Sequence, residues 1–306
     1  MKILVFGIGG IGGWVGGALA KVSPSAYFCA RGDNLKAIKE KGIQVESELL
    51  GDFLVKSFLA GEQVASMGTM DVILLSCKGN NLEAACRDIE PAISEGMLVV
   101  PQLNGVLVSR RMKSFFPDCA LVADGTIRVF SHREGPGHVV QTAGSGKIVM
   151  GMDGAPCSQQ MEKFATLLAE AGIPVEITED IALDSWEKYA LMGSNSALFC
   201  AFDGNAGEVR SRKDFLPVVH EAVREVIAVA GAEGVCLPES YEEEYVNLFL
   251  SLPPDTVTSL YRDLKSGKNM KDTEADMILG NLVQMGKKRG IHVPVFRRVW
   301  EWACGR

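Results

Sequence analysis

A glycine-rich segment close to the start of the chain has the pattern G-x-G-x-x-G. Its residues are Gly7, Ile8, Gly9, Gly10, Ile11 and Gly12. An apolar run at 3–6 precedes it and a Gly- and Ala-rich helical pattern at 11–21 follows, which is the context that the motif requires. There the glycines permit a sharp turn, a close approach to a pyrophosphate and tight helix–sheet packing, while the helix N-terminus faces the anion. The segment therefore predicts a dinucleotide site, in preference to a plain glycine-rich turn.

The residue that ends the second apolar run indicates which dinucleotide binds. A protein that binds NAD usually carries Asp or Glu at this place, about 20 residues after the glycine loop, where the carboxylate holds the ribose 2′-hydroxyl. This chain has Arg31 there, and a guanidinium can bind a 2′-phosphate through two parallel hydrogen bonds. Asp33 follows Gly32, where a turn should carry it away. We therefore predict NADPH as the cofactor, the alternative being that Arg31 is a solvated loop charge.

Short apolar runs alternate with helical patterns in the first half of the chain. The predicted strands are 3–6, 26–30, 43–46, 54–58, 71–76, 97–100 and 121–123, and the predicted helices are 11–21, 35–41 and 82–89. Several of the runs are continuously apolar, as expected of strands that are buried on both faces. The pattern predicts an α/β fold with a Rossmann-type, doubly wound parallel sheet.

The segment 125–151 has a different pattern. Its predicted strands are 126–131, 138–142 and 147–150, with a turn at 133–137. We expect these strands to form an antiparallel extension on the edge of the parallel sheet. A helix at 158–171 and a strand at 175–177 then complete the first domain.

Strand signals disappear from about residue 180 onward. The predicted helices are 181–202, 215–233, 241–251, 259–265 and 273–289, and Gly or Pro stands at most of the breaks between them. We therefore expect residues 1–179 to form an NADP-binding Rossmann-type domain. Residues 180–306 are expected to form an all-helical C-terminal domain for the substrate and catalysis.

Composition excludes several classes of function. The 306 residues carry a formal net charge of −7, which disfavours a nucleic-acid surface, and no apolar run reaches the roughly 20 residues of a membrane span. The eight cysteines include no Cys-x-x-Cys pair, and the four histidines are dispersed, so we expect no metal site. Scattered cysteines in apolar runs are typical of reduced thiols, which predicts a cytoplasmic protein.

These motifs and several later ones resemble the ketopantoate reductases (2-dehydropantoate 2-reductases) in order and spacing across nearly the whole chain. The matching segments are the glycine loop, Ala30-Arg31-Gly32, Ser76-Cys77-Lys78, Gln102–Val106 with its Asn104-Gly105 turn, Asp184–Lys188 with its Trp-x-Lys, Ser259 with Asp263, Thr273–Asp276, Gly280 and Gly290–Pro294. The resemblance implies the same two-domain fold and the reduction of a 2-oxo acid.

The resemblance also implies roles for individual residues. Lys188 would donate the proton to the developing alkoxide, provided that its pKa is lowered, and Glu274 would hold the substrate hydroxyl and influence the charge of Lys188. Ser259 would contact the substrate carboxylate and Asn104 would bridge substrate and cofactor. Lys78 would flank the nicotinamide, so that Lys78, Asn104 and Glu274 are all expected to contact the cofactor. Without the resemblance, Lys188 and Glu274 would be interpreted as ordinary solvated helix charges.

The chain departs from the family in the region expected to bind the substrate. The family has asparagines four and eight residues after its catalytic lysine, whereas this chain has Met192 and Ser196 there. Asn195, seven residues after Lys188, lies near the same helix face and is our candidate replacement. Met192 cannot donate a hydrogen bond to a substrate oxygen.

A second departure lies between Asp263 and Glu274. The loop at 265–272 is about three residues longer by spacing than the family's loop, so Lys271 competes with Glu274 for the acidic position. The order Glu274, Asp276 and Gly280 favours Glu274. The cofactor prediction is unaffected, while the identity of the 2-oxo acid is left open.

The leading hypothesis is NADPH-dependent reduction of 2-dehydropantoate to pantoate, in pantothenate and coenzyme A biosynthesis. One alternative is a 2-hydroxyacid dehydrogenase of the same superfamily that acts on a different 2-oxo acid. The alternative of another class is an NADP-binding sensor without turnover, which would need no Lys188. Helical second domains of this kind often pair, so a homodimer is a further expectation.

Overall fold

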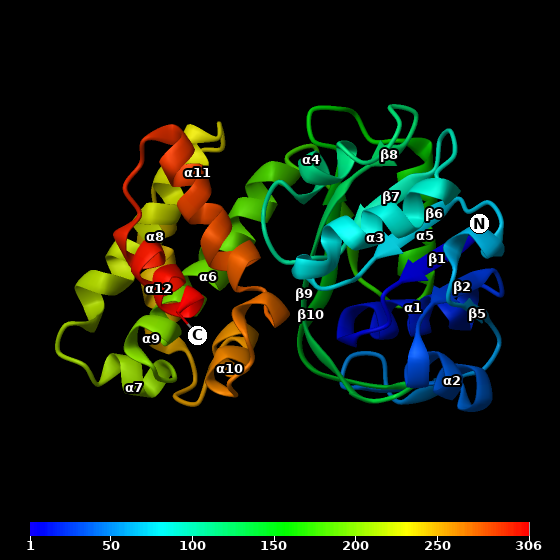
Figure 1. The fold of residues 1–306 in the computed structure, drawn as a ribbon, viewed down its shortest axis with the longest axis horizontal. Coiled ribbons are helices and arrows are strands. Elements are labelled where there is room, and N and C mark those ends of the chain that lie inside the picture. The colour runs from blue at the N-terminus through cyan, green and yellow to red at the C-terminus, as the bar shows by residue number, and fades with distance from the viewer. Residues whose placement is uncertain (306) are drawn as a thin grey trace. The chain divides into compact units, whose positions relative to one another are not determined.

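The computed structural model describes residues 1–305 and divides the chain into two compact units (Figure 1). The N-terminal unit comprises residues 1–103 and 107–181, and the C-terminal unit comprises 104–106 and the chain from Ala182 onward. The main division lies two residues after the predicted boundary. The short loop Asn104–Val106 belongs to the C-terminal unit although it is flanked in sequence by N-terminal segments, which was not predicted.

The N-terminal unit contains the predicted parallel sheet, which we call sheet A. Its six strands have the order β5-β2-β1-β6-β7-β8. Their bounds are β1 Ile3–Phe6, β2 Ala26–Cys29, β5 Leu59–Gly61, β6 Val72–Leu75, β7 Leu98–Pro101 and β8 Leu121–Val122. Every residue of β1, β6 and β7 is buried, which accounts for their continuously apolar sequences. The chain leaves β1 for β2 on one side and later returns to β6 on the other, so β1 is the switch point where such sheets bind ligands.

The helices of this unit follow the strands as expected, except that the helix at 108–113 was not predicted. They are α1 Gly10–Val22, α2 Gly32–Lys41, α3 Leu82–Ile89, α4 Val108–Lys113 and α5 Gln159–Glu170. Helix α2 ends at Gly42, which has a positive φ of 90° that suits glycine. The doubly wound α/β fold predicted from the sequence is confirmed.

The predicted antiparallel extension of sheet A is wrong, because these strands form a separate sheet B. Its order is β11-β10-β3-β4, with β9 also paired to β10. The bounds are β3 Ile43–Ser47, β4 Phe53–Val55, β9 Asp124–Gly135, β10 His138–Gly151 and β11 Val175–Ile177. The segments 138–142 and 147–150, predicted as two strands, are one strand that continues through register shifts near Gln141 and Gly144.

Helix α1 contacts strands of both sheets, and small residues make this possible. A Cβ added at Gly16 would lie 2.7 Å from Phe28 and 2.9 Å from Val5 of sheet A. A Cβ at Gly13 would lie 2.5 Å from Val139 of sheet B. Larger side chains on α1 would prevent sheet B from packing this closely on the helix. This explains the Gly- and Ala-rich sequence of α1.

A buried polar network beside Gly13 also joins α1 to sheet B. The Trp14 indole N–H donates to Ser47 Oγ at 3.1 Å, and Ser47 Oγ donates to Gln141 Oε1 at 2.7 Å. Trp14 is fully buried, and Gln141 is 1% exposed. Each of these buried polar groups has a partner, so the network fixes how sheet B sits on the helix.

The C-terminal unit is helical, as predicted. Its helices are α6 Ile181–Phe202, α7 Ala206–Arg210, α8 Phe215–Ala232, α9 Tyr241–Ser251, α10 Ser259–Lys265, α11 Asn281–Arg289 and α12 Pro294–Cys304, with a π-helical turn at Asp276–Gly280. The predicted helix 273–289 is thus a π-helical turn followed by α11. The sequence prediction also missed α12, because Pro294 looked like a break, whereas proline suits the first turn of a helix.

A buried carboxylate holds the start of α12. Glu225 of α8 is 4% exposed and accepts hydrogen bonds from the backbone N–H groups of Val295, at 2.7 Å, and Phe296, at 3.1 Å. Desolvation raises the pKa of Glu225 to about 7, although these two hydrogen bonds act in the opposite direction. The backbone N–H groups in the first turn of α12 therefore donate to a carboxyl group whose pKa lies near neutral pH.

The close packing of α1 can be tested with Gly13→Val. The added side chain would overlap Val139, and overpacking of this kind costs about 1–3 kcal/mol. We expect a clearly lower melting temperature by scanning calorimetry. Gly231→Ala is the control, since outside its chain neighbours and the adjacent backbone of α8 no atom of residues 1–305 lies within 4 Å of a Cβ there, and Ala favours the helix. Wild-type melting of Gly13→Val would contradict the packing of sheet B on α1.

The titration of Glu225 predicts a pH dependence of stability. Because its pKa is raised in the folded state, its contribution is fully present below about pH 4.5 and is lost as the pH rises through 7. The loss should approach about 3 kcal/mol in the free energy of unfolding. Urea unfolding of the wild type and of Glu225→Gln between pH 4.5 and 8 isolates this contribution, since other groups titrate in both. Parallel stability curves for the two proteins would show that Glu225 does not titrate in this range.

Candidate functional site

The glycine loop has the geometry that its sequence pattern predicts. Gly7 has φ of +93°, and a Cβ there would lie 2.9 Å from the Ser76 backbone. A Cβ at Gly12 would lie 2.0 Å from the Gly7 carbonyl oxygen. At Gly9, directly before α1, no atom of residues 1–305 apart from its own neighbours would lie within 4 Å of a Cβ. The loop therefore leaves open space beside the backbone N–H groups at the start of α1, as a pyrophosphate requires.

The remaining residues of the loop have other neighbours. A Cβ at Gly10 would lie 2.2 Å from the carbonyl oxygen of Ser131 on β9, and Ser131 Oγ donates to the Gly10 carbonyl at 3.0 Å. Ile8 is buried, and Ile11 packs against the core. Gly10 is thus required by the packing of β9, a constraint that the G-x-G-x-x-G pattern does not include.

A buried hydroxyl beside the loop fits a bound cofactor. Ser76 Oγ is buried and has no hydrogen-bond partner among residues 1–305. A Cβ at Gly12 would lie 3.0 Å from the Ser76 Cβ, so the serine follows β6 next to the glycine loop. Buried polar atoms normally have partners. The open space at Gly9 and this unpaired hydroxyl together fit a dinucleotide at the switch point of sheet A.

The structure places Arg31 at the expected position and gives it a partner. Arg31 follows β2 as the N-cap residue of α2, and its Nη2 lies 2.6 Å from Oδ2 of Asp88 on α3. No sequence pattern linked these residues, which are 57 positions apart. Lys78 is exposed after β6 and precedes the short 3₁₀ turn Gly79–Asn81. The contacts of Arg31 and Lys78 with a cofactor remain predictions.

Two predicted site residues meet within the C-terminal unit. Asn104 Nδ2 donates to Glu274 Oε2 at 3.3 Å, although 170 residues separate them. Asn104 lies three residues after β7, at the carboxyl end of sheet A, and is followed by Gly105 with φ of +113°. The fold thus brings an amide and a carboxylate that are distant in the sequence together within the C-terminal unit.

Lys188 lies on α6 between aromatic residues that anchor the helix. It is half-buried, whereas Trp186 and Tyr189 are each 1% exposed and their rings meet edge to face with centroids 5.8 Å apart. The Tyr189 hydroxyl donates to the carbonyl of Ile278 in the π-helical turn that follows Glu274. Burial raises the pKa of Tyr189, so its hydroxyl remains protonated. This bond ties the helix of Lys188 to the segment of Glu274, a link that no sequence motif indicated.

The other predicted substrate residues have different environments. Ser196 is fully buried and donates to the Met192 carbonyl at 2.8 Å, while Asn195 is 8% exposed and its Oδ1 accepts from the Tyr245 hydroxyl at 2.9 Å. Ser259 is exposed at the first turn of α10. Asn195 and Ser196 thus face packed protein, whereas Met192, between Lys188 and Asn195, is partly exposed. The substrate contacts of Asn195, Ser196 and Ser259 remain predictions.

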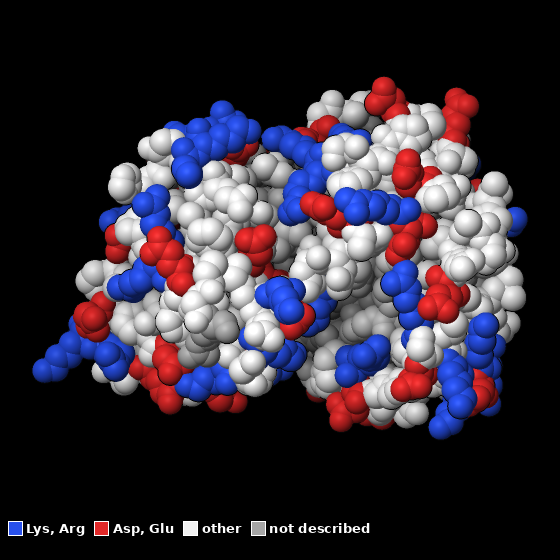
Figure 2. All heavy atoms as spheres, viewed as in Figure 1, with Lys and Arg blue, Asp and Glu red and all other residues white. Residues whose placement is uncertain are grey.

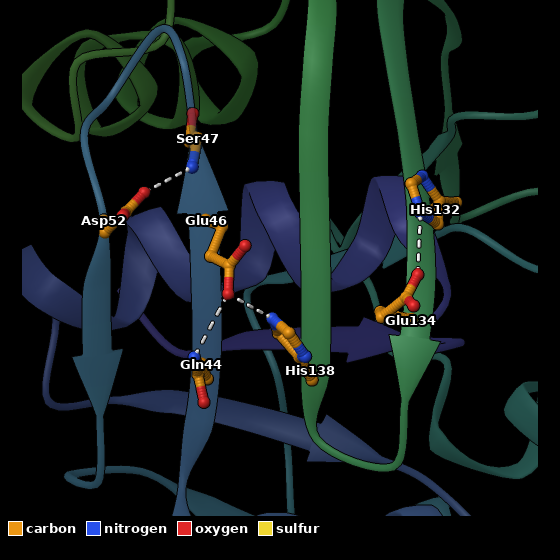
Figure 3. A network of polar contacts seen from close by, with 7 residues as sticks. All are labelled: Gln44, Glu46, Ser47, Asp52, His132, Glu134 and His138. Atoms are coloured by element: carbon orange, nitrogen blue, oxygen red, sulfur yellow. Dashed lines mark hydrogen bonds and ion pairs between the residues drawn. The ribbon is translucent and has the colours of Figure 1, made fainter.

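Charged and titratable groups elsewhere form pairs and small networks, such as Glu242 with His220 and Arg224. On sheet B, Glu46 accepts from His138 at 2.9 Å, and His132 lies 3.1 Å from Glu134 (Figure 3). Figure 2 shows acidic and basic side chains mixed over the visible face of each unit. In the part of the chain that the structure describes, no three His, Cys, Asp or Glu side chains are arranged to hold a metal ion. Among residues 1–305, no helix combines the length and apolar character that a membrane crossing requires.

Known proteins similar to this chain match it over nearly its full length. It is 25% identical over 301 residues to the uncharacterized oxidoreductase YkpB of Bacillus subtilis, covering 98% of this chain and 97% of that protein. It is 26% identical to a 2-dehydropantoate 2-reductase of Streptococcus pyogenes, covering 98% and 96%.

Two solved structures have a similar fold. A PanE/ApbA family ketopantoate reductase from Ralstonia eutropha aligns with a TM-score of 0.88 and 27% identity, covering 99% of this chain and 97% of that chain. A D-mandelate dehydrogenase, solved with NADH and anilino(oxo)acetate, aligns with a TM-score of 0.86 and 24% identity, covering 100% and 98%.

Two family profiles match consecutive parts of the sequence. The profile of ketopantoate reductase PanE/ApbA matches residues 3–154, and that of the ketopantoate reductase PanE/ApbA C-terminal domain matches residues 180–304. Together they cover most of the chain and confirm the resemblance found in the motifs. The chain belongs to the ketopantoate reductase PanE/ApbA family of oxidoreductases.

Proposed function

We propose that the protein reduces 2-dehydropantoate to pantoate with NADPH. The observation that carries this proposal is the hydrogen bond between Asn104 and Glu274. Both residues belong to the C-terminal unit, which also carries Lys188, and Asn104 lies three residues after β7. An amide, a carboxylate and a lysine are the groups that orientation and protonation of a 2-oxo acid require.

The chemistry assigns one task to each side chain. When bound, the reduced nicotinamide supplies a hydride to the carbonyl carbon of the substrate. The electron pair of the C=O π bond moves onto oxygen, and the Lys188 ammonium donates a proton to it, which leaves a neutral amine and an alcohol. Glu274 accepts a hydrogen bond from the new hydroxyl, and Asn104, whose amide donates to Glu274, keeps that carboxylate in place. Ser259, Asn195 and Ser196 are the proposed further contacts with the substrate.

The proposed cofactor and its location follow from the N-terminal unit. Gly9 leaves space for the pyrophosphate, Ser76 offers a hydroxyl without a partner among residues 1–305, and Arg31 follows β2 where a 2′-phosphate would lie. Lys78, at the end of β6, adds a second cation on the same edge of the sheet. The free cysteines support action in the cytoplasm, and a small 2-oxo acid as substrate and a homodimer are part of the proposal.

A second candidate substrate is a bulkier 2-oxo acid. Met192 is partly exposed one turn after Lys188 and offers an apolar surface without a hydrogen-bond donor. A D-mandelate dehydrogenase of similar fold was solved with NADH and anilino(oxo)acetate, an aromatic 2-oxo acid derivative. An aromatic or branched side chain would gain from contact with Met192, whereas the hydroxyl of 2-dehydropantoate would not.

The substrate is tested by following NADPH oxidation with purified protein. We expect the highest kcat/KM with 2-dehydropantoate, compared with branched aliphatic and aromatic 2-oxo acids. Lys188→Ala should lower kcat about 100-fold or more while NADPH still binds, because general acid catalysis contributes this much. Turnover only with aromatic 2-oxo acids would contradict 2-dehydropantoate as the substrate and support the bulkier 2-oxo acid. Binding of NADPH with no turnover of any acid would support a sensor, and an unchanged Lys188→Ala would remove Lys188 from the mechanism.

The role of Tyr189 is tested by Tyr189→Phe, which removes its bond to Ile278. We expect kcat to fall about tenfold and the pH profile of kcat to shift, because the helix of Lys188 loses its tie to the segment of Glu274. Tyr261→Phe is the control, since it removes the hydroxyl of another buried tyrosine of the same unit, bonded to Asp203 at 3.2 Å. Equal effects of the two substitutions on the pH profile would reduce Tyr189 to a purely structural role.

A further inference from the structure

The partner of Arg31 is the starting point. The Arg31 guanidinium follows β2, where the 2′-phosphate of a bound cofactor would lie, and it is already in contact with a carboxylate. Its Nη2 is 2.6 Å from Asp88 Oδ2, a distance typical of a charge-assisted hydrogen bond. Both side chains remain accessible, with 62% of Arg31 and 41% of Asp88 exposed. The ion pair can therefore open when an anion approaches.

The charges around this pair are mostly negative. The Cys29 thiol, at the end of β2, is sensitive to these charges. Burial raises its pKa to about 11, the Arg31 charge lowers the pKa, and the Asp88 and Glu62 charges raise it further. Asp33 lies in the first turn of α2, two residues after Arg31. The Arg31 guanidinium thus lies near the end of β2 together with the carboxylates of Asp88, which contacts it directly, and Glu62.

We propose that Asp88 reduces the preference of this protein for NADPH over NADH by competing with the 2′-phosphate for Arg31. A 2′-phosphate must either displace the Asp88 carboxylate from the guanidinium or bind beside it against charge repulsion. NADH has no 2′-phosphate, so it does not meet this competitor. Asp88 consequently weakens the binding of NADPH selectively and narrows the preference that Arg31 creates. This inference rests on the proposed use of Arg31 as the 2′-phosphate ligand.

Substitution of Asp88 should be tolerated by the fold. Ion pairs that are this exposed contribute little to stability, so Asp88→Asn should fold normally. We expect it to bind NADPH about three- to tenfold more tightly, which is the effect of removing one nearby charge close to a protein surface. Its affinity for NADH should be unchanged. In the double variant Arg31→Ala with Asp88→Asn, the gain should disappear, because the competition needs the guanidinium.

The matched control is Asp71→Asn. Asp71 directly precedes β6, so it lies at the amino edge of sheet A, opposite the cofactor edge, and its carboxylate accepts from the backbone N–H of Lys2 at 2.7 Å. The substitution changes the net charge of the chain by the same amount. It should leave the affinities for both cofactors as they are in the wild type, which separates a local effect from a general loss of negative charge.

The experiment is a fluorescence titration of the full chain with NADPH and with NADH at a fixed ionic strength of about 0.1 M. Calorimetric titration with adenosine 2′,5′-bisphosphate and with AMP isolates the phosphate, and neither measurement requires turnover. Tighter binding of NADPH and of the bisphosphate alone supports the proposal. Equal changes for both cofactors, or weaker NADPH binding by Asp88→Asn, would overturn it.

These outcomes also separate the inference from the proposed reaction. If the titrations give the expected pattern while 2-dehydropantoate is not reduced, the substrate assignment fails and the role of Asp88 stands. If 2-dehydropantoate is reduced with NADPH but Asp88→Asn changes both cofactors alike, the reaction stands and Asp88 does not select. A wild type that binds neither cofactor would overturn both.

Discussion

Helix α1 is held between two sheets at distances that leave no room for side chains on several of its residues. Gly16 faces Phe28 and Val5 of sheet A, and Gly13 faces Val139 of sheet B. Because both sheets converge on this helix, its first residues have little freedom, and the open space at Gly9 is fixed at the end of β1. The dinucleotide loop is thus one end of a packing arrangement that extends through the N-terminal unit. The hairpin of β9 and β10 participates directly, through Ser131 on Gly10.

The C-terminal unit solves a related problem, which is to hold together groups that are distant in the sequence. Lys188 lies on α6, and Glu274 precedes a π-helical turn whose Ile278 carbonyl accepts the Tyr189 hydroxyl. Such turns are frequent at functional sites, since the altered backbone frees groups for other contacts. Asn104, in the short loop after β7 that belongs to the same unit, donates to Glu274. Each contact is weak by itself, but together they restrict the geometry in which a proton can be transferred.

Sequence patterns predicted those parts of the structure that depend on local constraints. The parallel sheet followed from continuously apolar runs such as Val72–Leu75, and the glycine loop followed from the requirements of a tight turn. Sheet B was misinterpreted because β10 pairs with β3, which lies about ninety residues earlier and carries no signal of its partner. The contacts of Asp88 and Tyr189 were not predicted for the same reason. Neither residue belongs to a sequence motif, and their partners, Arg31 and Ile278, are distant in the sequence. The candidate site was predictable where a family motif marks it, at Lys188, Glu274 and Asn104, whereas the burial of Asn195 and Ser196 required the packing of α6.

The central claim is that the glycine loop binds the cofactor while Lys188 protonates the substrate oxygen. A crystal structure with NADP⁺ and pantoate bound tests it most directly. The account predicts the pyrophosphate beside Gly9 at the start of α1 and the Lys188 Nζ within hydrogen-bonding distance of the pantoate 2-hydroxyl, with Glu274 on the same hydroxyl. A pyrophosphate elsewhere, or a substrate hydroxyl held by other side chains with Lys188 turned away, would contradict it.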